Sequence, residues 1–104
     1  MIVACYVVWN EAAMIAESLR SVKAYVDRYI IVDSAFTTNA VEATHSTDET
    51  RAIAEAVCAP VPLTYIESDR KLTEPEARNR YLAELGSDDW AFVIDGDEVF
   101  YGNY

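Results

Sequence analysis

The chain opens with an almost unbroken apolar run, Ile2 to Val8, and this run limits the fold more than any other feature. A strand covered on both faces needs apolar side chains at every position, whereas a half-exposed strand alternates apolar and polar residues. The run is shorter than the roughly 18 apolar residues that span a bilayer, and it lacks the basic start and cleavage site of a signal peptide. We therefore expect a central strand in a sheet with helices on both faces.

Helical patterns recur along the rest of the chain. Asn10 is placed to cap a first helix, and two capping boxes, at 46–49 and 73–76, predict the starts of two more. Gly86 is placed to end the third helix. The inner faces of the three helices are predicted from apolar spacing: Ile15, Leu19, Val22 and Val26; Thr50, Ile53, Ala54 and Val57; Ala77, Tyr81 and Leu85.

Short apolar runs predict three further strands, at 29–32, 63–66 and 90–94, whereas residues 34–45 are too irregular for either type of element. Strands that alternate with helices form parallel sheets with right-handed connections. The sequence therefore predicts one α/β domain over residues 1–104, with a parallel sheet of about four strands and flanking helices.

Composition excludes several classes of protein. The net charge of −10 argues against affinity for nucleic acid or anionic membranes. The three glycines, at positions 86, 96 and 102, fit neither a dinucleotide-binding GxGxxG motif nor a P-loop. One histidine, His45, leaves too few ligands for a Cys/His zinc site. Cys5 and Cys58 lie in apolar surroundings without CxxC spacing, so we expect buried free thiols and a cytoplasmic protein.

Polar residues follow three of the four predicted strands. Asn10 and Glu11 come after the first strand, Asp33 ends the second, and Asp95 and Asp97 follow the fourth. The carboxyl ends of parallel strands share one edge of the sheet, and ligands bind there in open α/β folds. These residues are therefore candidates for one site, although they are distant in the sequence.

The Asp-Gly-Asp motif at 95–97 places two carboxylates around a glycine. Mg²⁺ and Mn²⁺ take few protein carboxylates and complete their shells with phosphate oxygens, so the motif suits a nucleoside diphosphate with a metal. Arg70, Lys71 and Arg78 are the basic residues that could offset the charge of the phosphates. The same motif is also an ordinary turn after a strand, and the basic residues an exposed helix face. The residues alone leave both interpretations open.

Four landmarks in this order resemble the amino-terminal half of family 2 glycosyltransferases of the GT-A fold. An Asn-Glu pair at 10–11 follows the first strand, and Asp33 ends the second strand ahead of a Ser-Thr-Asp-x-Thr helix start at 46–50. Ala-Arg-Asn at 77–79 lies in the third helix, and the DxD-type signature at 95–97 closes the fourth strand. Together the landmarks cover nearly the whole chain, and it is their combination that is specific.

The resemblance implies a site for a nucleotide-diphosphate sugar, such as a UDP- or GDP-sugar, with Mn²⁺ or Mg²⁺ as cofactor. Asp33 would accept a hydrogen bond from the base, and Arg78 would lie near the base or the diphosphate. Asp95 would approach the ribose, and Asp97 would ligate the metal, with Asp95 as a second candidate ligand. The metal would stabilise charge on the leaving nucleoside diphosphate. The remaining donor-site residues implied are Val8, Trp9, Asn10 and Glu11.

Two features depart from the family pattern. Residues 34–45 lengthen the usual short connection after Asp33, and we expect them to form an extra loop over the sugar. The chain also ends at Tyr104, before the family's acceptor-binding half and its general base, so the catalytic residues are unknown and we expect a truncated enzyme. The fourth strand would then keep an open edge, where a second copy or a partner chain could pair.

The leading interpretation is thus the donor-binding domain of a metal-dependent glycosyltransferase. One alternative is a non-catalytic module that binds a nucleotide or nucleotide sugar and acts with a partner or as an oligomer. The other is a metal-binding structural domain unrelated to sugars.

Overall fold

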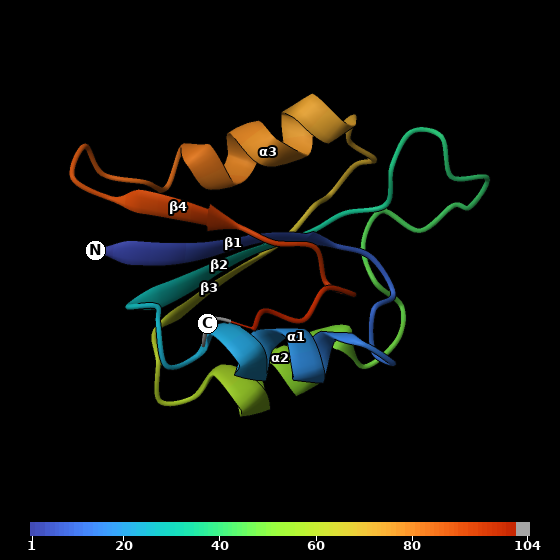
Figure 1. Ribbon diagram of the computed structural model, residues 1–104. Helices are drawn as coiled ribbons and strands as arrows, with labels where there is room; N and C mark the ends of the chain where they lie inside the picture. The colour runs from blue at the N-terminus through green and yellow to red at the C-terminus, as the bar shows by residue number, and fades with distance from the viewer. Residues whose placement is uncertain (102–104) are drawn as a thin grey trace.

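A computed structural model describes residues 1–101 as one parallel sheet between two layers of helices (Figure 1). The fold predicted from the sequence is confirmed; residues 102–104 of the predicted domain lie outside the described residues. The strands stand in the order β3-β2-β1-β4. The elements are β1 (Ile2–Val8), α1 (Ile15–Val22), β2 (Arg28–Asp33), α2 (Thr50–Cys58), β3 (Leu63–Glu67), α3 (Glu74–Leu82) and β4 (Trp90–Val93).

β1 lies between β2 and β4 and is covered on both faces, as its apolar run predicts. Val3 and Cys5 belong to the core cluster that includes residues of α3, whereas Ala4, Tyr6 and Val8 belong to the cluster that includes residues of α1 and α2. Figure 1 shows α3 on one face of the sheet and α1 with α2 on the other. Because side chains alternate along a strand, one set of β1 side chains is buried under α3 and the other under α1 and α2.

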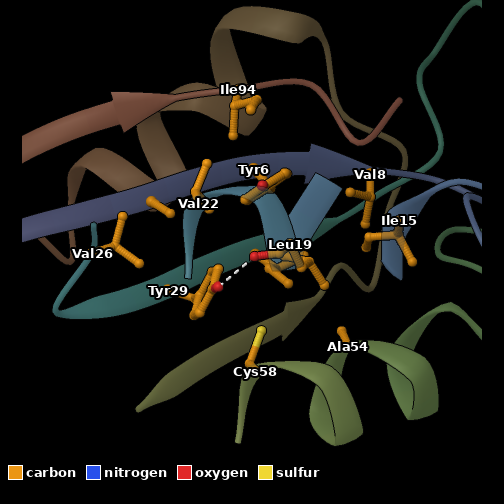
Figure 2. Close-up of a cluster of buried hydrophobic side chains, with 12 residues drawn as sticks. Tyr6, Val8, Ile15, Leu19, Val22, Val26, Tyr29, Ala54, Cys58 and Ile94 are labelled. Atoms are coloured by element: carbon orange, nitrogen blue, oxygen red, sulfur yellow. Dashed lines mark hydrogen bonds between the residues drawn. The ribbon is translucent and has the colours of Figure 1, made fainter. Parts of the chain in front are cut away.

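The larger core fills the space between the sheet and the two helices α1 and α2 (Figure 2). Ile15, Leu19 and Val22 are fully buried there, as their helical spacing predicts. The Tyr29 hydroxyl donates to the Leu19 carbonyl oxygen at 2.7 Å, so its polar end is satisfied inside the core. This hydrogen bond ties α1 to β2 within the core.

Both cysteines are free and buried, as expected from their apolar surroundings. Burial raises the pKa of the Cys5 thiol to about 11 and that of the Cys58 thiol to about 12. Because the thiolate is the reactive form, both side chains behave as small apolar groups at neutral pH.

Of the two predicted capping boxes, one is confirmed. Thr73 caps α3: its hydroxyl accepts from the Glu76 amide at 3.3 Å, and the Glu76 carboxylate accepts from the Thr73 amide at 2.9 Å. The box predicted at 46–49 is wrong, since Asp48 accepts the Thr50 amide at 3.0 Å instead. The hydroxyl of Ser46 is unavailable because it donates to Asp33.

Two further predictions of helix ends are wrong. Asn10 does not cap α1, which begins at Ile15 after a turn whose Glu11 carbonyl accepts two amides at 2.9 Å. Asn10 adopts a left-handed conformation (φ 48°) and its side chain accepts the Thr47 amide at 2.8 Å. Gly86 does not end α3, which stops earlier, at Leu82. The Gly86 amide instead donates to the Asp89 carboxylate in the turn that follows.

β4 is an edge strand, and within residues 1–101 no strand pairs with its outer side. On the α1 side it is covered by the segment that follows it, where the rings of Phe92 and Phe100 meet edge to face at 4.9 Å between centroids. Trp90 and Val93 remain 76% and 56% exposed. No helix of this part of the chain is long and apolar enough to cross a membrane.

Candidate functional site

A cavity of about 260 Å³ lies where β1 and β4 end, beside α3. Its polar lining is contributed by three segments that are far apart in the sequence: the residues after β1, helix α3 and the turn after β4. Apolar side chains of β1, α3 and the end of β4 complete it. The structure thus brings together four predicted site residues, Glu11, Arg78, Asp95 and Asp97, and adds Cys5, Val7, Phe36, Glu74, Tyr81, Val93, Ile94 and Gly96 to the lining.

The cavity is strongly acidic. Four carboxylates line it (Glu11, Glu74, Asp95 and Asp97) against the single guanidinium of Arg78. That guanidinium already forms an ion pair with Glu74 at 2.6 Å. An anionic ligand such as a diphosphate would be repelled unless a cation entered with it.

The pKa values of two cavity carboxylates reflect this crowding. Burial raises the pKa of Asp95, and the nearby charges of Glu98 and Asp97 raise it further. Burial likewise raises the pKa of Glu11, with the charges of Asp97, Asp48 and Asp95 adding to it. Both shifts mean that ionisation of these groups opposes folding.

Neutralising Asp95 is therefore expected to stabilise the metal-free protein. A raised carboxyl pKa gives stability that is complete below the unfolded pKa and is lost as the pH rises through the folded one. We expect Asp95→Asn to raise the melting temperature at pH 7 by about 2 °C, a small effect because the side chain is largely exposed. The gain should vanish near pH 4, in melts followed by circular dichroism. An equal gain at both pH values would show that like-charge repulsion is not its cause.

Gly96 is required by close packing at the turn between the two aspartates. A Cβ atom at this position would lie 3.3 Å from both Glu11 Cγ and Val8 Cγ1, closer than side chains normally approach. The absence of a side chain therefore lets the turn after β4 lie against the segment after β1. This contact brings Glu11 to the same cavity as Asp95 and Asp97.

Asp33 and Asn10 lie in a hydrogen-bond network instead of the cavity lining. Asp33 is fully buried, and one carboxylate oxygen accepts both the amide and the hydroxyl of Ser46 at 2.7 Å. Its other oxygen accepts the hydroxyl of Tyr65. Ser46 in turn accepts the Asn10 amide at 2.8 Å, and Asn10 accepts the Thr47 amide. The network ties the end of β2 to the segments that follow β1 and precede α2.

The remaining predicted residues flank these two features. Val8 is buried against the turn at Gly96, and Trp9 is half-buried, with an indole N–H that is enclosed and has no hydrogen-bond partner within residues 1–101. Arg70 pairs with Glu76 at 3.0 Å, and Lys71 donates to the Asn39 carbonyl at 2.9 Å. Of the three basic candidates, only Arg78 lines the cavity.

Of the eight lining residues that the sequence did not predict as site residues, Phe36 and Glu74 lie outside the sheet, the turn that follows it and the predicted inner face of α3. Phe36 belongs to the irregular stretch, where no periodic pattern indicates what a side chain faces. Glu74 could have been found, because it stands four residues before Arg78 on a predicted helix, a spacing at which opposite charges pair.

The donor set fits a divalent cation that shares its shell with a ligand. Among the described residues no three His, Cys, Asp or Glu side chains gather into a complete protein metal site. Two carboxylates on one short turn, Asp95 and Asp97, instead resemble the few protein ligands that Mg²⁺ and Mn²⁺ take beside substrate phosphates. The acidity of the cavity adds an electrostatic reason for a cation there.

Comparison with known proteins defines the class. The model of glycosyl transferase family 2 matches residues 3–104, and the chain belongs to this family. An uncharacterised glycosyltransferase of Rickettsia felis is 37% identical over 93 residues, which cover 86% of this chain and 26% of that protein. The crystal structure of S. aureus TarS superposes with a TM-score of 0.72 at 20% identity, over 92% of this chain and 16% of that one. The fold is therefore that of a GT-A glycosyltransferase, and the chain spans about a quarter or less of these relatives.

Proposed function

We propose that the chain binds a nucleotide-diphosphate sugar in the cavity between β1, β4 and α3, as the donor-binding part of a glycosyltransferase. The observation that supports this most is the meeting of Glu11, Arg78, Asp95 and Asp97 around one cavity in a family 2 fold. Arg78 would face the diphosphate, and Asp95 would approach the ribose. Val8, Trp9, Asn10 and Asp33 would support the base pocket at the neighbouring edge of the sheet.

We further propose that Asp97, with Asp95 beside it, holds Mn²⁺ or Mg²⁺ when the nucleotide binds. Such a cation would stabilise the charge that develops on the departing nucleoside diphosphate. The chain's own contribution is to hold two carboxylates on a turn that close packing at Gly96 fixes. Positioning of this kind reduces the entropy lost when the ligand is bound.

Titration calorimetry with UDP and with GDP, in the presence and absence of Mn²⁺, tests the proposed donor site. We expect one of the two nucleotides to bind saturably, and to do so only when the metal is present, because four carboxylates repel an uncompensated diphosphate. If the folded chain bound neither UDP nor GDP, with or without Mn²⁺, the result would contradict the proposal. Binding of equal strength without the metal would support a nucleotide site but contradict a role for the cation.

A second candidate function is a non-catalytic binding module that acts as an oligomer or with a partner chain. The observation that favours it is the open edge of β4, where Trp90 and Val93 are exposed and a shallow groove of about 490 Å³ lies along the strand. Unpaired edges of this kind pair readily with another strand. In a longer glycosyltransferase chain, a later segment could pair with the same edge. The oligomeric state of the chain therefore helps to separate the two candidate functions.

Sedimentation equilibrium of the chain over a hundredfold concentration range measures that association. If β4 pairs between copies, Val93→Lys should shift the population to monomer, because the new charge would be buried beside the pairing strand. Val41→Lys, the same change at an exposed position in the loop after β2, serves as the control. A wild-type chain that stays monomeric at every concentration would exclude pairing of two copies.

A further inference from the structure

Two buried hydroxyl groups connect the turn at 95–97 to the protein core. The Ser18 hydroxyl, on α1, donates to the main-chain carbonyl oxygen of Asp95 at 3.3 Å, and it lies 3.1 Å from the Tyr6 hydroxyl on β1. Ser18 and Tyr6, the hydroxyl pair, are both fully buried. Neither side chain belongs to the lining of the proposed donor cavity, so any effect of the pair on a ligand passes through the turn.

The direction of these hydrogen bonds follows from the number of protons. A serine hydroxyl has one proton, and because Ser18 gives it to Asp95, the Tyr6 hydroxyl donates to Ser18. Burial raises the pKa of Tyr6 to about 12, so the phenol keeps its proton at neutral pH. Hydrogen bonds that form such a chain polarise one another, so the Tyr6 hydroxyl strengthens the bond between Ser18 and the turn.

The main chain of Asp95 is held on both sides. Its carbonyl oxygen accepts the Ser18 hydroxyl and also the Glu98 amide, the latter at 2.9 Å. Its amide donates to the Glu98 carboxylate at 2.8 Å. A carbonyl oxygen has two lone pairs, and both are used here. Asp95 can therefore offer a cation its carboxylate and not its main-chain oxygen.

A pair of hydroxyl groups adds little stability to an apolar core. Tyr6 lies in the same core cluster as Ile94, the residue before the turn (Figure 2). Burial of hydroxyl groups among such side chains costs free energy, which their hydrogen bonds offset. Apolar groups of the same shape would fill the space at a similar free energy of unfolding. What the hydroxyl pair adds is a fixed direction for the Asp95 carbonyl.

We propose that Ser18 and Tyr6 are positioning residues for the cation-binding turn: they hold the main chain of Asp95 so that the Asp95 and Asp97 carboxylates face the cavity together. The inference rests on the proposed donor function and adds to it two residues that lie outside the cavity. The turn is then ordered before a ligand arrives, so binding requires little further loss of entropy.

Order parameters from ¹⁵N relaxation of the metal-free chain measure the order of the turn. In the wild type the amides of Gly96 and Asp97 should have the value of rigid backbone, about 0.85. Ser18→Ala, Tyr6→Phe and the double variant should each lower it to below about 0.7. Tyr29→Phe is the matched control, because it removes a buried phenol hydroxyl that bonds to the Leu19 carbonyl and not to the turn. Unchanged order in all three variants, or an equal loss in the control, would overturn the assignment.

Thermal unfolding followed by circular dichroism separates positioning from a contribution to the fold. The double variant replaces both hydroxyl groups by apolar groups and leaves neither without a partner. It should therefore melt within about 4 °C of the wild type while the turn loses its order. A fall of more than about 8 °C in the double variant would show that the hydroxyl pair serves the fold, and would overturn the assignment.

Calorimetric titrations with UDP and with GDP, at a series of Mn²⁺ concentrations, connect the hydroxyl pair to the proposed function. The Mn²⁺ concentration that gives half of the maximal nucleotide affinity should rise about fivefold in Ser18→Ala and in Tyr6→Phe, and stay unchanged in Tyr29→Phe. An unchanged Mn²⁺ requirement in variants whose turn has lost its order would overturn the assignment. If the wild type bound neither nucleotide but the turn still lost its order in these variants, the proposed function would be contradicted and the positioning of the turn supported.

Discussion

Replacing Asp33 by alanine is expected to lower the free energy of unfolding by about 3 kcal/mol, the largest loss that a single polar substitution in this chain should cause. Asp33 is fully buried, and its carboxylate accepts three hydrogen bonds, two from Ser46 and one from Tyr65. Burial, followed by this hydrogen bond, raises the pKa of Tyr65, so the phenol stays protonated and donates at any physiological pH. Removal of the carboxylate would leave three donors of the partly buried residues Ser46 and Tyr65 without their acceptor.

Urea unfolding followed by circular dichroism measures the effect of this substitution. Asp69→Ala is the matched control, because it removes an exposed aspartate at the same end of the sheet, and it should change stability by less than about 0.5 kcal/mol. Asp33→Asn keeps one acceptor oxygen, so its loss of unfolding free energy should lie between those of Asp33→Ala and Asp69→Ala. A loss below about 1 kcal/mol for Asp33→Ala would mean that water replaces the carboxylate and that the network stabilises little.

The same network separates two roles for Asp33. The family resemblance predicts contact with the base, whereas the buried carboxylate already serves Ser46 and, through Ser46, Asn10. Asp33→Asn folds under both readings and should lower nucleotide affinity only if the carboxylate contacts the base. The prediction of a base contact thus has a test that does not depend on the stability result.

The four strands could be predicted because the evidence for them is local. An apolar run such as Ile2 to Val8 has no other place in a small domain than the centre of a sheet, and the structure puts β1 there. The capping box of α3 is equally local, since both of its residues, Thr73 and Glu76, lie within one turn. The rule that parallel strands end at one edge then brought Glu11, Asp95 and Asp97 into one predicted site.

The two wrong predictions of helix caps, by Ser46 and by Asn10, share a different cause, which is competition from distant partners. Ser46 could cap α2, but it donates to Asp33, which lies 13 residues away. Asn10 could cap α1, but it pairs with Thr47, 37 residues away. A short polar side chain can satisfy many donors, and the sequence does not show which of them the tertiary fold brings near. Phe36 was missed for the same reason, because only its β-bridge to Leu72 decides what it faces.

Asp97→Ala is expected to weaken nucleotide binding in Mn²⁺ by on the order of 100-fold, about 2.7 kcal/mol, and so to abolish the benefit of the metal. The argument starts from the charge of the cavity, where four carboxylates face one guanidinium that is already paired with Glu74. A diphosphate can enter only if its charge is compensated. Loss of Asp97 removes a ligand of the compensating cation and leaves Asp95 as the one aspartate of the turn, too few to hold the metal near the phosphates.

The fold should survive this substitution, which makes the loss of binding interpretable. The side chain of Asp97 is exposed, and its charge helps to raise the pKa of both Glu11 and Asp95. The metal-free variant should therefore melt at or slightly above the wild-type temperature. Asp88→Ala, at the opposite end of β4, controls for the general loss of one negative charge and should bind as the wild type does. If Asp97→Ala kept full metal-dependent affinity while Asp95→Asn lost it, the cation would belong to Asp95. If both kept it, the cation would be held by other carboxylates of the cavity, such as Glu11 or Glu74, and its assignment to this turn would be wrong.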